Sequence, residues 1–176
     1  PADNFILAWT LSPAEFAVQH ENGAASLEQR LKAANEMLEK GWKVRICFDP
    51  VIYMKNFEGE YGELIKKTFK ELSPDEILDV SIGTFRISKE YLKRMRKYRV
   101  TSEVLSYPFF CKDGVYSYYP QHINKMMDFM EKEVKKYVDQ YTPEMYATLL
   151  LPAGITSESS IRYKDEDKLL DIATDI

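Results

Sequence analysis

The chain has 176 residues, of which 45% are hydrophobic and 30% charged, and this composition suits one folded domain and excludes a disordered chain. Its 24 basic and 28 acidic residues give a net charge of -4, so any contact with nucleic acid has to be local. No apolar run approaches the ~20 residues that cross a membrane, and the first residues lack the features of a signal peptide, which predicts a cytoplasmic protein without a membrane partner.

Strand-like and helix-like segments alternate along the chain, which is typical of an α/β protein with parallel strands. In chain order, the predicted elements are a strand at 4–12, a loop at 13–25, a helix at 27–40, a strand at 42–50, a helix at 59–72, a strand at 76–85, a helix at 88–98, a fourth strand near 101–110, a long helix at 121–141 and a last strand at 145–152. Ser26 is the predicted N-cap of the first helix, Gln29 its capping-box partner, and Gly41 the residue that ends it.

The strand at 42–50 has one polar face. Successive side chains of a strand point to opposite faces, so the apolar residues Val44, Ile46 and Phe48 share one face. The polar residues Arg45, Cys47 and Asp49 share the other. We expect the apolar set to pack against helices and the polar set to face a cofactor and substrate. Pro50 lacks an N–H and is expected to end the strand. The alternative is that Asp49 only caps the next loop and that Arg45 pairs with a neighbouring carboxylate.

The two cysteines, Cys47 and Cys111, have neither CxxC spacing nor a histidine partner, so the sequence predicts no disulfide framework and no metal site. Two buried thiols are the simplest expectation, since free cysteine is among the most buried residue types.

The segment "CKDGVYSYYP" (111–120) predicts a β-hairpin that turns at Lys-Asp-Gly. Tyr116, Tyr118 and Tyr119 could stack on bases, and Lys112 could reach a phosphate. At least one of these tyrosines should then project into solvent. The preceding helix is basic, through Lys89, Lys93, Arg94, Arg96, Lys97 and then Arg99. It could follow phosphates, although a solvated helix face explains the same pattern.

Three segments carry a resemblance: "LEQRLKAANEMLEKGWKVRICFDPVI", "EGEYGELIKKTF" and "VSIGTFRISKEYLKRM". Together they resemble the carboxy-terminal half of the spore photoproduct lyase family, the DNA-repair branch of the radical S-adenosylmethionine (SAM) enzymes. The resemblance covers about residues 5–135. It implies an α/β fold that is part of an open parallel (β/α)6 radical SAM barrel, with its later strands only.

This resemblance also implies the organisation of the chain. Residues 1–152 are expected to form the partial barrel, including a hairpin at 107–120 and the helix at 121–141, and residues 153–176 a flexible tail. The chain is expected to begin inside a larger barrel, whose missing amino-terminal half would be a partner. Strand edges exposed in this way would favour dimerisation.

The cofactors implied by the resemblance are SAM and a [4Fe–4S] cluster. The cluster-binding CxxxCxxC motif is absent, because the chain has only two cysteines. Thr10 matches a hydroxyl that contacts SAM in the family, and Ser12 shares its face. Arg30 resembles a helix Arg near the SAM carboxylate, and the backbone at Asp49 matches a strand end that contacts the adenosine portion. Thr10 could equally be an ordinary strand residue, and Arg30 could pair along its helix.

The implied function is that of a radical SAM lyase that repairs DNA lesions by hydrogen abstraction with a 5′-deoxyadenosyl radical, in the full-length protein, with this chain alone inactive. The family carries an Arg-Tyr pair on the hairpin, where this sequence has Lys112-Asp113. A radical SAM enzyme of the same family with a different substrate therefore remains an alternative. A non-catalytic nucleic-acid-binding module is a second hypothesis, from another class.

Overall fold

The structure is a computed structural model that describes residues 1–2, 4–99, 102–138 and 160–164. A four-stranded sheet has the order β1-β2-β3-β7, with strands β1 (Ile6–Thr10), β2 (Lys43–Val51), β3 (Asp79–Thr84) and β7 (Ser160–Lys164). The first three strands are parallel, and β7 pairs antiparallel with β3. The expected α/β class is confirmed, whereas the barrel layout stays a prediction, because the described strands form an open sheet.

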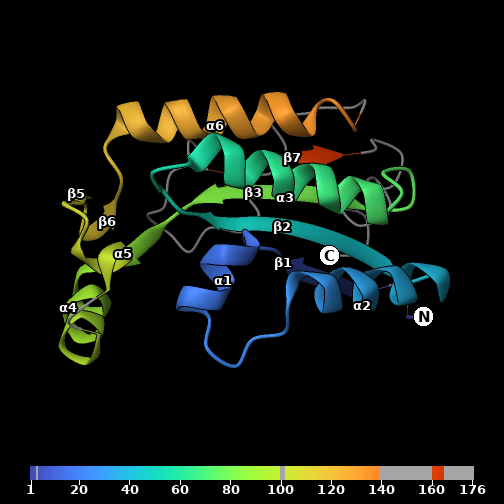
Figure 1. The fold of residues 1–176 in the computed structure, drawn as a ribbon, viewed down its shortest axis with the longest axis horizontal. Helices are drawn as coiled ribbons and strands as arrows, with labels where there is room; N and C mark the ends of the chain where they lie inside the picture. Colours follow the sequence, from blue (N-terminus) through green and yellow to red (C-terminus); the bar gives the residue numbers. More distant parts are fainter. Residues whose placement is uncertain (3, 100–101, 139–159, 165–176) are drawn as a thin grey trace.

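Three helices pack on one face of this sheet: α2 (Leu27–Glu39), α3 (Phe57–Glu71) and α6 (Pro120–Val134) (Figure 1). One apolar core joins them to the strands, and it includes Leu31 of α2, Ile65 of α3, Met130 of α6 and Phe48 of β2. Within the described ranges, no helix has the length and hydropathy that a bilayer crossing requires.

The start of α2 follows the predicted capping box. The Ser26 hydroxyl accepts a hydrogen bond from the Gln29 N–H at 3.3 Å, and the Gln29 side chain accepts one from the Ser26 N–H at 2.9 Å. At the other end, Gly41 has φ +79°, a left-handed conformation that glycine adopts without a steric penalty. Both predictions for this helix are confirmed.

Two segments have a different structure from the one expected. The predicted loop at 13–25 contains helix α1 (Ala14–His20), since helix-forming alanine and glutamate follow Pro13 at the N-cap position. The predicted fourth strand near 101–110 was wrong: Ser102 caps a short helix, α5 (Glu103–Ser106), by accepting a hydrogen bond from the Leu105 N–H.

Pro50 does not end its strand, contrary to our expectation. Strand β2 continues to Val51, which pairs with Thr84 of β3 after a register shift between Phe48 and Val51. An irregularity of this kind accommodates a residue that cannot donate to the ladder, so the strand passes the proline.

A small second sheet lies at one end of the molecule (Figure 1). It has the order β4-β6-β5 and consists of β4 (Arg86–Ser88), β5 (Phe110–Lys112) and β6 (Val115–Ser117). The predicted hairpin β5–β6 is confirmed, and its turn residues Asp113 and Gly114 both have positive φ, as a two-residue hairpin turn requires. Helix α4 (Lys89–Tyr98) follows β4.

The carboxy-terminal part differs from the expectation where it is described. Helix α6 ends at Val134 rather than at 141. Residues 160–164, which fall within the tail expected to be flexible, form β7. The strand expected at 145–152 and the domain boundary at 152 lie outside the described residues.

Two buried tyrosines fix the loop that follows β2. The Tyr61 hydroxyl accepts a hydrogen bond from the Ile52 N–H at 2.8 Å, and the Tyr118 hydroxyl accepts one from the Tyr53 N–H at 3.0 Å. Both tyrosines are 1% exposed, and burial raises the pKa of each phenol, so they stay protonated. The loop backbone therefore bonds to α3 and to the chain after β6 instead of to a strand.

This arrangement predicts that Tyr61→Phe lowers the free energy of unfolding by about 1–3 kcal/mol, because it leaves a buried N–H without a partner. Tyr98→Phe is the matched control, since Tyr98 is 82% exposed and should tolerate the change. Urea unfolding measures both. Equal stability of the two variants would show that the hydroxyl does not hold the loop.

Candidate functional site

The sheet face opposite the helices carries the polar side chains. The strand register sets Thr10 beside Cys47 and Cys47 beside Ser81, so the three side chains form a row across β1, β2 and β3. On the opposite face, the predicted apolar set of β2 is fully buried: Val44, Ile46 and Phe48. The predicted division of β2 into an apolar and a polar face is confirmed.

Arg45 pairs with Asp79 on this polar face. Arg45 Nε and Nη2 lie 2.5 and 2.6 Å from the two Asp79 carboxylate oxygens, which is the bidentate geometry of a strong charge-assisted pair. The Asp79 side chain is fully buried. The alternative from the sequence, an Arg45 paired with a neighbouring carboxylate, is therefore confirmed.

Asp49 lies near the carboxyl end of β2 and pairs with Arg86 of β4. Arg86 Nη2 is 2.9 Å from Asp49 Oδ2, and Arg86 Nη1 also donates to the Thr84 carbonyl at 3.0 Å. Gly83 leaves the space for this pair, because a Cβ there would lie 2.7 Å from Asp49 Oδ2. Both charged side chains are 22–28% exposed, so the pair remains accessible. Arg86 was not among the predicted site residues, although it lies within the quoted segment "VSIGTFRISKEYLKRM".

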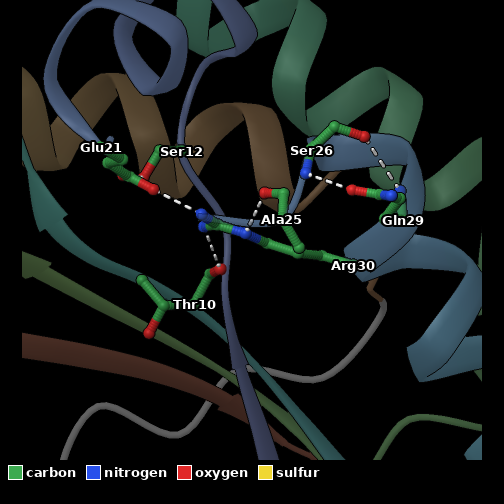
Figure 2. Close-up of polar contacts among 7 residues, drawn as sticks. All are labelled: Thr10, Ser12, Glu21, Ala25, Ser26, Gln29 and Arg30. Carbon is green, nitrogen blue, oxygen red and sulfur yellow. Dashed lines mark hydrogen bonds and ion pairs between the residues drawn. The ribbon is translucent and has the colours of Figure 1, made fainter. Parts of the chain in front are cut away.

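Arg30 joins the ends of three elements (Figure 2). Its Nε donates to the Ala25 carbonyl at 2.9 Å, its Nη1 donates to the Thr10 carbonyl at 3.0 Å, and its Nη2 pairs with Glu21. The Ser12 hydroxyl donates to the same Glu21 carboxylate at 2.6 Å. Arg30 is thus paired across loops rather than along its helix.

The charge of Glu21 depends on its contacts with Ser12 and Arg30, which together with Thr10 form what we call the Arg30 junction. Burial disfavours its ionised form, but the hydrogen bonds from Ser12 and Arg30 and the charge of Arg30 outweigh burial, so the pKa of Glu21 lies below its ordinary value. A charged Glu21 therefore holds Ser12 and Arg30 together at neutral pH.

Three of the four residues expected to contact SAM meet at this junction: Thr10, Ser12 and Arg30. The Thr10 hydroxyl points away from Arg30 (Figure 2) and has no hydrogen-bond partner among the described residues, so it can bond to a ligand. The side chains of Ser12 and Arg30 are already bonded to Glu21. Asp49, the fourth, lies on the neighbouring strand.

A groove of about 530 Å³ opens between α1, the loop after β2 and α5. Phe16, Tyr53 and Tyr107 line it together with three carboxylates, Glu15, Glu60 and Glu103. Helix α1 and the loop after β2 follow the carboxyl ends of the parallel strands β1 and β2, where open α/β sheets bind their ligands.

His122 of α6 holds two of the aromatic rings of this groove. Its ring stacks on Tyr53 with centroids 4.9 Å apart, and its Nδ1 lies 2.5 Å from the Tyr107 hydroxyl. Burial raises the pKa of Tyr107 above its ordinary value. No function was predicted for these residues, because they are far apart along the chain.

The hairpin exposes only part of the predicted binding set. Lys112 is exposed, and Tyr119 is 38% exposed beside Phe110. Tyr116 is half-buried. Tyr118 is 1% exposed and packs among other rings, so its position does not fit base stacking, and the structure gives it a packing role instead.

The cysteines are not the buried pair that we expected. Cys47 is half-buried on the sheet, and Cys111 is exposed on the hairpin. Within the part of the chain that the structure describes, no three His, Cys, Asp or Glu side chains come together in a way that could hold a metal ion.

Comparisons with known proteins agree with the resemblance found in the sequence. No protein-family model matches the chain. Spore photoproduct lyase from Clostridium acetobutylicum is 34% identical over 58 residues, which are 33% of this chain and 17% of that protein.

Solved structures of spore photoproduct lyase share the fold. One, complexed with dinucleoside spore photoproduct, has a TM-score of 0.65 and 16% identity, and a mutant with bound AdoMet (SAM) and the same dinucleoside has a TM-score of 0.63 and 14% identity. Each alignment covers 75% of this chain and 42% of the solved chain. This chain therefore spans less than half the length of the proteins that it resembles. Within the aligned 75% of its residues, it has the fold of spore photoproduct lyase.

Proposed function

We propose that this chain is the carboxy-terminal part of a cytoplasmic radical SAM enzyme of the spore photoproduct lyase type, which acts on lesions in DNA. The observation that carries the proposal is the shared fold over 75% of the chain, together with a polar face on its parallel strands. Catalytic and binding groups in such sheets collect at the carboxyl ends of the strands, which is where the groove and the Asp49–Arg86 pair lie.

The residues present fit SAM in part. Thr10 belongs to the polar row and is an exposed residue, so its hydroxyl would donate to or accept from the bound cofactor. Arg30 would act on SAM indirectly, because its bond to the Thr10 carbonyl fixes the end of β1. In enzymes of this type, SAM is the source of the 5′-deoxyadenosyl radical that abstracts hydrogen.

The residues present do not fit a [4Fe–4S] cluster. Such a cluster needs three or four thiolates, and the chain has only Cys47 and Cys111, on different sheets. We therefore infer that the cluster-binding segment belongs to another part of the same barrel, and that this chain is inactive without it.

The hairpin favours one alternative, a related enzyme with another substrate. Asp113 takes a left-handed turn position with φ 51°, where the family carries one residue of its Arg-Tyr pair. Tyr119 and Lys112 are then the exposed groups with which the hairpin would contact a nucleic acid. Their chemistry suits a base stack and a phosphate contact, respectively.

The cofactor proposal predicts that Thr10→Val weakens SAM binding by about 1 kcal/mol, the net contribution of one hydrogen bond. The free energy of unfolding should not change, because valine has a similar shape. Ser73→Ala is the control, since that exposed hydroxyl follows α3 at the opposite edge of the sheet. Titration calorimetry of the protein that includes its cluster-binding segment measures the affinity for SAM. Equal affinities of the two variants would show that Thr10 is an ordinary strand residue without a role in SAM binding.

The hairpin proposal predicts that Tyr119→Ala weakens DNA binding by about 1–3 kcal/mol with little loss of stability, which is the effect of a lost base stack. Lys112→Ala should weaken binding to every sequence alike and lower the salt dependence, as a phosphate contact would. Tyr118→Phe provides the contrast in stability, because it removes a buried hydrogen bond and should lower the free energy of unfolding. Fluorescence anisotropy gives the affinities; if Tyr119→Ala binds like the unmodified protein, the hairpin is only a structural element.

A further inference from the structure

The segment at 86–99 concentrates positive charge in an acidic chain. It contains seven basic residues and one acidic residue, a net charge of +6, whereas the whole chain has -4. Helix α4 accounts for most of this segment. Counter-charges within the fold, solvent and its ions, or a partner outside the fold can accommodate a local charge of this size.

Among the contacts made by the described residues, only two of the seven cations have a structural role that accounts for them. Arg86 pairs with Asp49, and Arg96 donates to the carbonyls of Leu105 and Tyr107 at 2.7 and 3.3 Å, which holds α5 against α4. The other five side chains make no ion pair or hydrogen bond with any described residue: Lys89, Lys93, Arg94, Lys97 and Arg99.

The helix presents part of this charge on one face, together with two aromatic rings. Leu92 is its only buried residue. Helical spacing places three cations on the side of α4 away from Leu92: Lys93, Arg94 and Lys97. Tyr91 and Tyr98 are seven residues apart, so their rings lie one above the other next to Arg94. The two rings are 53% and 82% exposed. We call these five residues the α4 face.

The chemistry of the α4 face fits a phosphate backbone. Lysine and arginine bind phosphate through charge, and tyrosine hydroxyls donate to phosphate oxygens. A membrane surface fits less well, because the α4 face has no aliphatic side chain to insert and α4 has only 10 residues.

The position of the α4 face extends the hairpin surface. The Lys89 N–H donates to the Gly114 carbonyl at 2.9 Å, which joins the start of α4 to the hairpin turn next to Lys112. Figure 1 shows α4 at the end of the molecule where β5, β6 and α5 gather. A nucleic acid on the hairpin would therefore pass close to α4.

We propose that the α4 face is a second nucleic-acid contact, which binds the phosphate backbone of duplex DNA beside the lesion site whether or not a lesion is present. The choice of DNA as the partner rests on the proposed function. The contact would provide lesion-independent affinity, while the hairpin and groove would address the altered bases.

The test is binding of an undamaged, fluorescently labelled 20-base-pair duplex to the full chain, measured by anisotropy over a series of salt concentrations. The triple variant Lys93→Glu, Arg94→Glu, Lys97→Glu should bind at least about 10-fold more weakly, and the slope of log K against log[salt] should fall by about 2 to 3, as expected when three phosphate contacts are lost. The matched control is Lys32→Glu, Lys66→Glu, Lys70→Glu, which makes the same charge change on exposed positions of α2 and α3 and should keep both quantities nearly unchanged.

Each result decides the proposal. Equal duplex affinity of the α4 variant and the control overturns it, and if Tyr119→Ala still weakens binding to damaged DNA, the proposed function stands. If the unmodified chain shows no salt-dependent duplex binding, both the α4 contact and the choice of DNA are wrong. If the α4 variant instead loses binding to vesicles containing phosphatidylserine and keeps its duplex affinity, the α4 face contacts membranes and the proposal fails.

Discussion

The two-residue alternation of the parallel strands is the constraint on which the rest of the structure depends. Because Ile46 and Phe48 must pack against the helices, the intervening residues of β2 have to occupy the other face. The parallel register then sets Cys47 between Thr10 and Ser81. A polar surface across three strands is therefore a direct consequence of burying the apolar residues, and a ligand site can form there without disturbing the core.

The loops at the carboxyl edge are held by side chains rather than by strand pairing. Phenol hydroxyls from α3 and from the chain after β6 bond the backbone that follows β2, and Arg30 bonds the end of β1. Buried backbone N–H groups are satisfied in this way where the ladder stops. These contacts keep the groove walls in place, and they explain why Tyr118 serves packing instead of recognition.

The sequence predicted the features that depend on neighbouring residues. The capping box at Ser26, the two faces of β2 and the hairpin turn at Asp113 each follow from a short local pattern. It could not predict the Asp49–Arg86 pair or the contact of His122 with Tyr53, because these residues meet only after the strands and α6 have packed. Helices α1 and α5 were missed for another reason: they are short, and their local patterns compete with those of a loop or a strand.

Our central proposal is that this fold is part of an enzyme that uses SAM on damaged DNA. The most direct measurement is an anaerobic assay of the protein together with its CxxxCxxC segment, with a reductant, SAM and dinucleoside spore photoproduct, in which mass spectrometry follows 5′-deoxyadenosine and the dinucleoside. We predict SAM cleavage, and conversion of the dinucleoside as well would identify spore photoproduct as the substrate. SAM cleavage without conversion would point to another substrate, and the absence of SAM cleavage by a protein with a fully assembled cluster would contradict the account.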